Sequence, residues 1–129
     1  MHPHEEALVR TFITPERRSR WLQGLASDKR RAKQVDRLNH CRDLDWRYAT
    51  ELPSTADVVA FLRARGAPEA CYVLSSTGAL DGREMPLAEA VWAAEAAGWG
   101  TLVGCVPGRL AYYYDEVGLR RMVLERAGR

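Results

Sequence analysis

The segments T-L-V-G-C-V at residues 101–106 and R-L-A-Y-Y-Y at residues 109–114 flank Pro107-Gly108 and set the architecture of this chain. Both segments are rich in β-branched and aromatic residues, which strands favour. The Pro-Gly pair favours a type II turn, which suits a two-residue hairpin poorly, so we expect a slightly longer loop. Alternation divides the second strand into two faces, with Leu110, Tyr112 and Tyr114 on one and Ala111 and Tyr113 on the other.

Two more strands are predicted around this hairpin. L-R-R-M-V-L-E-R at residues 119–126 follows a turn around Gly118 and extends the hairpin into an antiparallel meander. A-C-Y-V-L-S-S at residues 70–76 reads as the first strand, and Asp81-Gly82 is a strong turn signal. Pro86 then opens a helix that Gly98 stops.

The N-terminal half has helical patterns instead. Apolar spacing predicts helices over residues 5–13, 15–25 and 28–38, and Ser54 or Thr55 caps a fourth helix that Gly66 ends. We therefore predict one α+β domain over residues 1–129. Helices occupy about residues 5–65, and an antiparallel sheet of about four strands, with one or two packed helices, occupies about residues 68–127.

Composition is that of a globular protein. The chain has 129 residues, of which 47% are hydrophobic and 28% charged, and this argues against wholesale disorder. No apolar run approaches the roughly 20 residues of a membrane span, and the N-terminus lacks a signal-peptide pattern, so we expect a cytoplasmic protein. The three cysteines, Cys41, Cys71 and Cys105, have no C-x-x-C spacing and are expected to be free thiols, the latter two as small core residues.

The net charge of +2 conceals an asymmetry. Residues 1–40 carry a charge of +4, and the remainder of the chain carries −2. Much of the excess lies in the predicted helix 28–38, where one face is apolar and the opposite face is cationic. Cations at the first turn of a helix oppose the macrodipole unless an anion binds there. The candidate ligand-binding cations are Lys29, Arg30, Arg31, Lys33 and Arg37.

This cationic face has two interpretations beyond a solvated surface. It could hold a phosphate-bearing ligand through ion pairs and the N–H groups of the helix start. It could also contact the backbone phosphates of a nucleic acid without reading bases.

The segment N-H-C-R-D-L-D-W-R-Y at residues 39–48 concentrates ionisable groups. His40, Asp43 and Asp45 are candidate catalytic residues, because two carboxylates and an imidazole could hold a divalent metal for hydrolysis. The alternative is a structural junction in which both aspartates cap local turns and pair with Arg42 and Arg47.

A third candidate surface combines Arg109 with the tyrosine run, of which Tyr113 lies on a face of its own. Tyrosine and arginine are favoured at interaction hot spots. Strand tyrosines also commonly bury their rings while keeping the hydroxyl wet, and this alternative stays open.

Four blocks occur in order along the chain: H-C-R-D-L-D-W-R-Y-A, C-Y-V-L-S, L-D-G-R-E-M-P-L and C-V-P-G-R-L-A-Y-Y. With them the chain resembles a family of small uncharacterised bacterial proteins over about residues 8–126. The resemblance implies a bacterial cytoplasmic source, and it implies no activity, cofactor or catalytic residue.

The sequence thus favours a small non-catalytic binding or regulatory protein whose partner is a protein or an anionic, phosphate-bearing ligand. One alternative is a nucleic-acid-associated protein that uses the basic helix 28–38. Another is a small metal-dependent hydrolase centred on His40, Asp43 and Asp45. No cofactor is expected except a divalent metal under the hydrolase alternative, and no membrane partner is expected.

Overall fold

The structure, a computed structural model, describes residues 2–115 and 120–126. The turn predicted around Gly118 and the side chain of Cys41 lie outside the described part. The α-helices are α1 (Pro3–Phe12), α2 (Arg18–Ala26), α3 (Arg31–Val35), α4 (Val58–Ala64) and α5 (Leu87–Ala97), with 3-10 helices η1 (Pro15–Arg17), η2 (Asp36–Cys41) and η3 (Trp46–Tyr48). The strands are β1 (Ala49–Glu51), β2 (Ala70–Ser75), β3 (Glu84–Pro86), β4 (Thr101–Val106), β5 (Leu110–Asp115) and β6 (Arg120–Glu125).

All described strands form one antiparallel sheet in the order β1-β6-β5-β4-β2-β3. The α+β class and the meander of β4, β5 and β6 are confirmed, but the prediction of about four strands was wrong, because the sheet has six. The two missed strands, β1 and β3, have three residues each, which is too short to show a period of two. β1 lies within the segment predicted to be helical. It pairs with β6 and forms one edge of the sheet.

The turn between β4 and β5 has the geometry that its sequence predicts. The N–H of Arg109 donates to the Val106 carbonyl at 3.0 Å, and Gly108 has a φ of +79°. Val106 pairs with Leu110, so three residues form the loop. The expectation of a loop longer than two residues is therefore confirmed. Gly108 supplies the positive φ that a type II turn requires.

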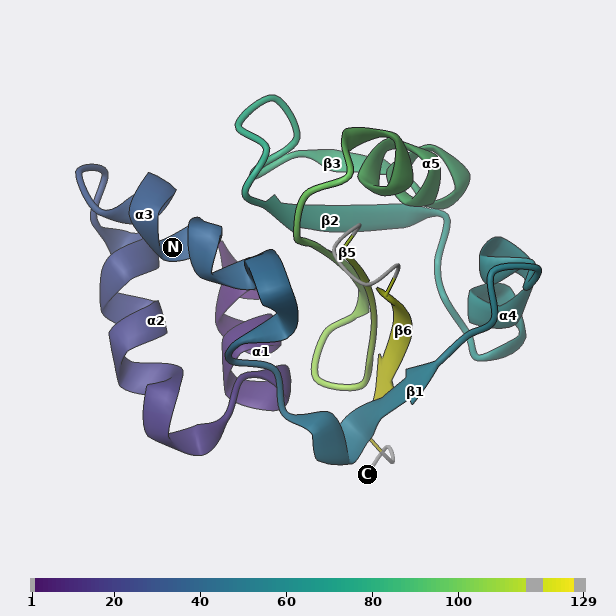
Figure 1. Ribbon diagram of the computed structural model, residues 1–129, viewed down its shortest axis with the longest axis horizontal. Helices are drawn as coiled ribbons and strands as arrows, with labels where there is room; N and C mark the ends of the chain where they lie inside the picture. The colour runs from purple at the N-terminus through teal and green to yellow at the C-terminus, as the bar shows by residue number, and fades with distance from the viewer. Residues whose placement is uncertain (1, 116–119, 127–129) are drawn as a thin grey trace.

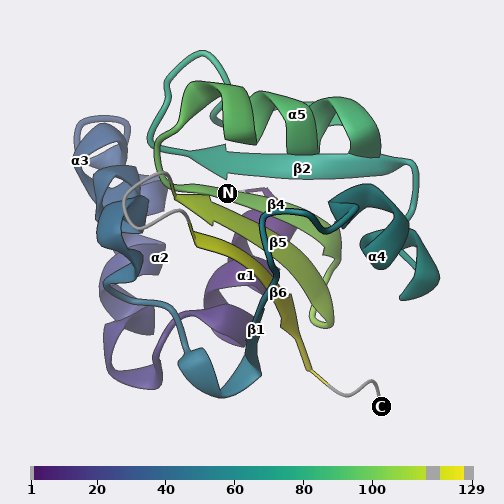
Figure 2. The ribbon, with the colours of Figure 1, turned by 45° about the vertical axis from the view of Figure 1, so that its right-hand side comes forward.

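Helices cover both faces of the sheet (Figure 1). Ala111 and Tyr113 point into a core shared with α1, α2 and α3, and Leu110 and Tyr112 point into a second core beneath α4 and α5. The predicted division of β5 into two faces is therefore confirmed. Figure 2 shows α5 running along the sheet on one side while α1 and α2 lie on the other.

The two glycines predicted to stop helices do so, whereas the predicted cap of the fourth helix differs from the observed one. Gly66 and Gly98 follow α4 and α5 with φ of +92° and +81°, as predicted for helix stops. The predicted cap at Ser54 or Thr55 was wrong, because Asp57 caps α4 by accepting the N–H of Ala60 at 3.0 Å. Each of the three is a good capping residue type, so residue type alone did not choose among them.

Cys71 and Cys105 are buried on neighbouring strands, as expected of small core residues. Their Sγ atoms are 4.0 Å apart. Among the described residues, no helix has the length and hydrophobicity needed to cross a membrane.

Candidate functional site

The segment after α3 departs from helical geometry and shapes the site. The prediction of one continuous helix over residues 28–38 was wrong, since α3 ends at Val35 and tightens into η2. Within η2, Asn39 is extended and His40 has a φ of +69°, the left-handed region that non-glycine residues rarely adopt. A residue held there costs of order 1 kcal/mol and persists only where its surroundings impose it.

The surrounding contacts come from the C-terminal half of the chain. The Tyr113 hydroxyl donates to the Leu38 carbonyl, and the His40 N–H donates to the Asp115 carboxylate. The Gly100 N–H donates to Asn39 Oδ1 at 2.7 Å. A Cβ on Gly100 would lie 2.4 Å from the carbonyl carbon and oxygen of Leu38, so the two backbones are in direct contact. These contacts fix the 36–42 segment against the sheet.

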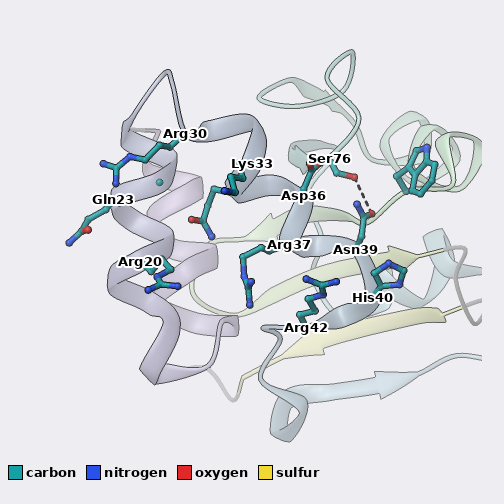
Figure 3. Close-up of a pocket in the computed structure, with 13 residues that line it drawn as sticks. Arg20, Gln23, Arg30, Lys33, Asp36, Arg37, Asn39, His40, Arg42 and Ser76 are labelled. Atoms are coloured by element: carbon teal, nitrogen blue, oxygen red, sulfur yellow. Dashed lines mark hydrogen bonds between the residues drawn. The ribbon is translucent and has the colours of Figure 1, made fainter.

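A pocket of about 890 Å³ opens beside this segment. Its walls come from α2, α3, the 36–42 segment and the residues that follow β2 and α5. The lining residues are Arg20, Gln23, Gly24, Arg30, Lys33, Gln34, Asp36, Arg37, Asn39, His40, Arg42, Ser76 and Trp99. Figure 3 shows Arg20, Gln23 and Arg30 on one side and Asn39, His40 and Ser76 on the other, with Arg37 and Arg42 between them. The volume is within the range of small-molecule sites.

The pocket is strongly basic, with five Lys or Arg side chains and one acid, Asp36. Arg37 is neutralised by Asp43, with an Nε to Oδ2 distance of 2.7 Å. Arg20, Arg30, Lys33 and Arg42 have no carboxylate within ion-pairing distance in the part of the chain that the structure describes. Like charges gathered in a concave site raise the local positive potential and attract anions.

Gln34 adds a buried hydrogen-bond donor to the lining of the pocket. Its side chain is 92% buried and packs against Gly24, where an added Cβ would lie 2.4 Å from Gln34 Oε1. Its Nε2 has no hydrogen-bond partner among the described residues. An unmet buried donor costs about 1–3 kcal/mol, so this amide is ready to bond with an acceptor that approaches it.

The two aspartates of the 39–48 segment do not line the pocket. Asp43 accepts hydrogen bonds from Trp21 Nε1 at 2.9 Å and from Arg37, and Asp45 accepts from the backbone and guanidinium of Arg47. Both are buried, whereas His40 is exposed at the pocket wall. In the described ranges, no group of three or more His, Cys, Asp or Glu side chains could hold a metal ion.

The structural-junction interpretation of this segment is close to the observed geometry, with one difference. Asp45 pairs with Arg47 as expected, but Asp43 pairs with Arg37 of η2 and not with Arg42. Arg42 is exposed and lines the pocket. The catalytic assignment of His40, Asp43 and Asp45 stays a prediction.

Burial alone would raise the pKa of Asp43, but the hydrogen bonds from Arg37 and Trp21 and the charge of Arg37 outweigh it. The pKa of Asp43 therefore lies below its usual value. A carboxyl with a depressed pKa stabilises the fold above its unfolded pKa, about 4, and this contribution is lost as the pH falls through the folded pKa.

Asp43→Asn is accordingly expected to be less stable than the wild type at neutral pH, with the difference closing as the pH falls below about 4. Urea unfolding between neutral pH and pH about 3 measures this. The exposed Asp28, changed to Asn, serves as a control and should leave the pH dependence unchanged. A gap between Asp43→Asn and wild type that stays constant across this range would contradict the assigned role of Asp43.

The other predicted ligand residues are placed as follows. Arg30, Lys33 and Arg37 converge on the pocket, and Lys29 is exposed outside its lining. Arg31 turns away, since it pairs with the buried Glu5 at 2.6 Å and with Asp81 at 2.7 Å. The long helix whose start was predicted to bind an anion does not form among the described residues, because α3 has only five residues.

Arg109 and Tyr113 do not form a shared surface. Tyr113 is fully buried and its hydroxyl bonds inside the core. Arg109 lies at the other end of β5, where it donates to the Arg65 carbonyl at 3.0 Å and approaches Glu125.

Sequence reasoning missed most of the uncharged lining. Gln23 and Gln34 come from helical faces, and Ser76 and Trp99 come from the ends of elements far along the chain. The bond between Asn39 and Gly100 joins residues 61 positions apart, and no local pattern reports such a contact. Two sequence signals indicated the pocket: the charge of the predicted helix, and His40 of the 39–48 segment.

Comparison with protein-family models, with curated proteins and with solved structures gives no match. The resemblance to a family of small bacterial proteins stays a prediction. The pocket therefore has to be understood from its own residues.

Proposed function

We propose that this protein binds a phosphate-bearing anion in the basic pocket and acts as a non-catalytic binding or regulatory module. The observation that carries the proposal is the convergence of Arg20, Arg30, Lys33 and Arg42 on one pocket without carboxylate partners among the described residues. Several arginines outside the pocket have their charge matched by an acid, as Arg121 does by pairing with Glu95 at 2.9 Å.

The origin of these cations argues against a plain solvated helix face. Arg20 comes from α2, Lys33 from α3, and Arg42 from the connection after η2. A solvated face arises within a single helix, whereas here three segments bring like charges together around a concavity. Guanidinium groups match phosphate oxygens in two-point hydrogen bonds, and lysine adds a point charge.

The hydrolase alternative receives less support from this geometry. Asp36 is the acid that lines the pocket, while Asp43 and Asp45 each accept hydrogen bonds from an arginine. Metal-assisted hydrolysis through these two aspartates would require a metal ion to displace Arg37 and Arg47, because each carboxylate already has a guanidinium partner.

The proposal is tested by calorimetric titration of the wild-type protein with inorganic tripolyphosphate at low and moderate salt. Binding is expected to be measurable at low salt and to weaken several-fold at moderate salt, because ions screen exposed charges over about 10 Å at 0.1 M. Arg83→Glu is a control for net charge, since Arg83 is exposed and lies outside the pocket, and it should bind as the wild type does. Absence of binding at low salt, or loss of binding in Arg83→Glu, would refute the proposal.

A further inference from the structure

One wall of the pocket carries an exposed aromatic ring. Trp99 lies between α5 and β4, lines the pocket and is 56% exposed. Its carbonyl accepts a hydrogen bond from Thr101 Oγ1 at 3.0 Å, which fixes the backbone of this residue. A large apolar ring left in water at the edge of a polar pocket gains free energy when a flat ligand covers it.

The Asn39 amide also lines the pocket and is bonded to Gly100, the residue that follows Trp99. Its Oδ1 accepts from the Gly100 N–H at 2.7 Å and from the Ser76 hydroxyl at 3.2 Å. These two bonds set the orientation of the amide, and Nδ2 has no hydrogen-bond partner in the described part of the chain. The wall therefore offers a ring to stack on and a donor whose direction is fixed.

Two of the pocket cations lie on the opposite side of the pocket from Asn39. Arg20 and Arg30 stand on the α2 and α3 side, across the pocket from Asn39 and Ser76 (Figure 3). The pocket thus combines a phosphate-attracting part with an aromatic and amide part. An inorganic anion would use the first part alone.

From this division we infer that the ligand is a nucleotide, with its phosphates on the pocket cations and its base stacked on the Trp99 indole. The inference rests on the proposed function and names the class of anion. Asn39 Nδ2 donates to an acceptor on the base or the sugar. Stacking on a protein aromatic ring accepts every base, so the geometry selects a nucleotide without selecting its base.

A free nucleoside polyphosphate and a nucleotide unit of a single strand share this chemistry. Base-bearing and base-free probes separate the role of the base from that of phosphate. A mixture of the common nucleoside triphosphates is compared with tripolyphosphate. A short single-stranded oligonucleotide is compared with an abasic strand of the same length.

Trp99→Ala tests the ring, and Trp92→Ala is the matched control, because Trp92 is 72% exposed on α5 and lies outside the pocket lining. In the wild type, the base-bearing member of at least one pair should bind about tenfold more tightly than its base-free partner. Trp99→Ala should abolish this advantage and leave tripolyphosphate binding unchanged, while Trp92→Ala should retain the advantage. The probe pair in which the base-bearing member binds more tightly shows whether the nucleotide is free or part of a single strand.

Equal affinity within both pairs would overturn the nucleotide inference while leaving anion binding established. An equal loss in Trp92→Ala and Trp99→Ala would overturn it as well. If tripolyphosphate and all other probes fail to bind, the proposed function itself falls, so the two failures are distinguishable.

Discussion

Gly100→Ala is expected to lower the free energy of unfolding by about 3 kcal/mol, because the new methyl group would collide with the backbone of Leu38. The added Cβ would lie 2.4 Å from the Leu38 carbonyl carbon and oxygen and 2.7 Å from the Asn39 nitrogen. These are backbone atoms, which cannot rotate away as the end of a side chain could. Either η2 moves off the sheet or the β4 start is displaced, and both outcomes break packed contacts.

The substitution should also weaken binding. Displacing Leu38 and Asn39 would break the Gly100 N–H bond to Asn39 and move the 36–42 segment that carries Arg37 and Arg42. We therefore expect tripolyphosphate affinity to fall at least about tenfold in protein that remains folded, because misplaced groups lose contacts worth about 1 kcal/mol or more each.

Gly78→Ala is the matched control, since a Cβ there would meet nothing within 4 Å. Its free energy of unfolding should stay within about 0.5 kcal/mol of the wild type in urea denaturation. Equal stability of Gly100→Ala and Gly78→Ala would show that Gly100 and Leu38 are not in contact.

Reversing two pocket charges together, Lys33→Glu with Arg42→Glu, is expected to weaken tripolyphosphate binding at least about 100-fold. Each substitution removes one charge-assisted contact and places a carboxylate where the ligand carries negative charge. Losing such a contact costs about 1.5–3 kcal/mol, and 1.4 kcal/mol corresponds to about tenfold in affinity. Both residues are exposed, so the fold should remain intact.

Two controls accompany this variant. Circular dichroism should show an unchanged spectrum and unfolding midpoint. Arg83→Glu combined with Arg63→Glu reverses the same number of charges at exposed sites outside the pocket and should retain binding. If both double variants lose affinity equally, the attraction belongs to the overall charge of the protein and not to the pocket.

The fold was predictable where one strand or helix carries its own pattern. The β4 and β5 segments, a loop longer than two residues at Pro107-Gly108 and the helix stop at Gly98 depend on local residue types, and the structure confirms them. Strands β1 and β3 have three residues each, which is too few to show an alternating pattern in the sequence. Pairing with β6 and β2 in the sheet defines them instead.

The pocket was predictable in its charge and in His40, which lines it. Arg30, Lys33 and Arg37 stand out as a cationic face in the sequence, and they converge in the structure. The left-handed conformation of His40 was not predictable, because tertiary contacts from Gly100 and Asp115 hold this segment in place. Trp99 gave no sequence signal, because its place in the pocket depends on a contact between distant segments.

The most direct test of anion binding in the pocket is a titration of ¹⁵N-labelled protein with tripolyphosphate, followed by amide chemical shifts. We expect the largest shifts at Arg30, Lys33, Gln34 and Arg42, which line the pocket, with little change at Arg83 and Arg109. Shifts that are largest at Arg83 or Arg109, or that are absent at saturating tripolyphosphate, would contradict anion binding in the pocket.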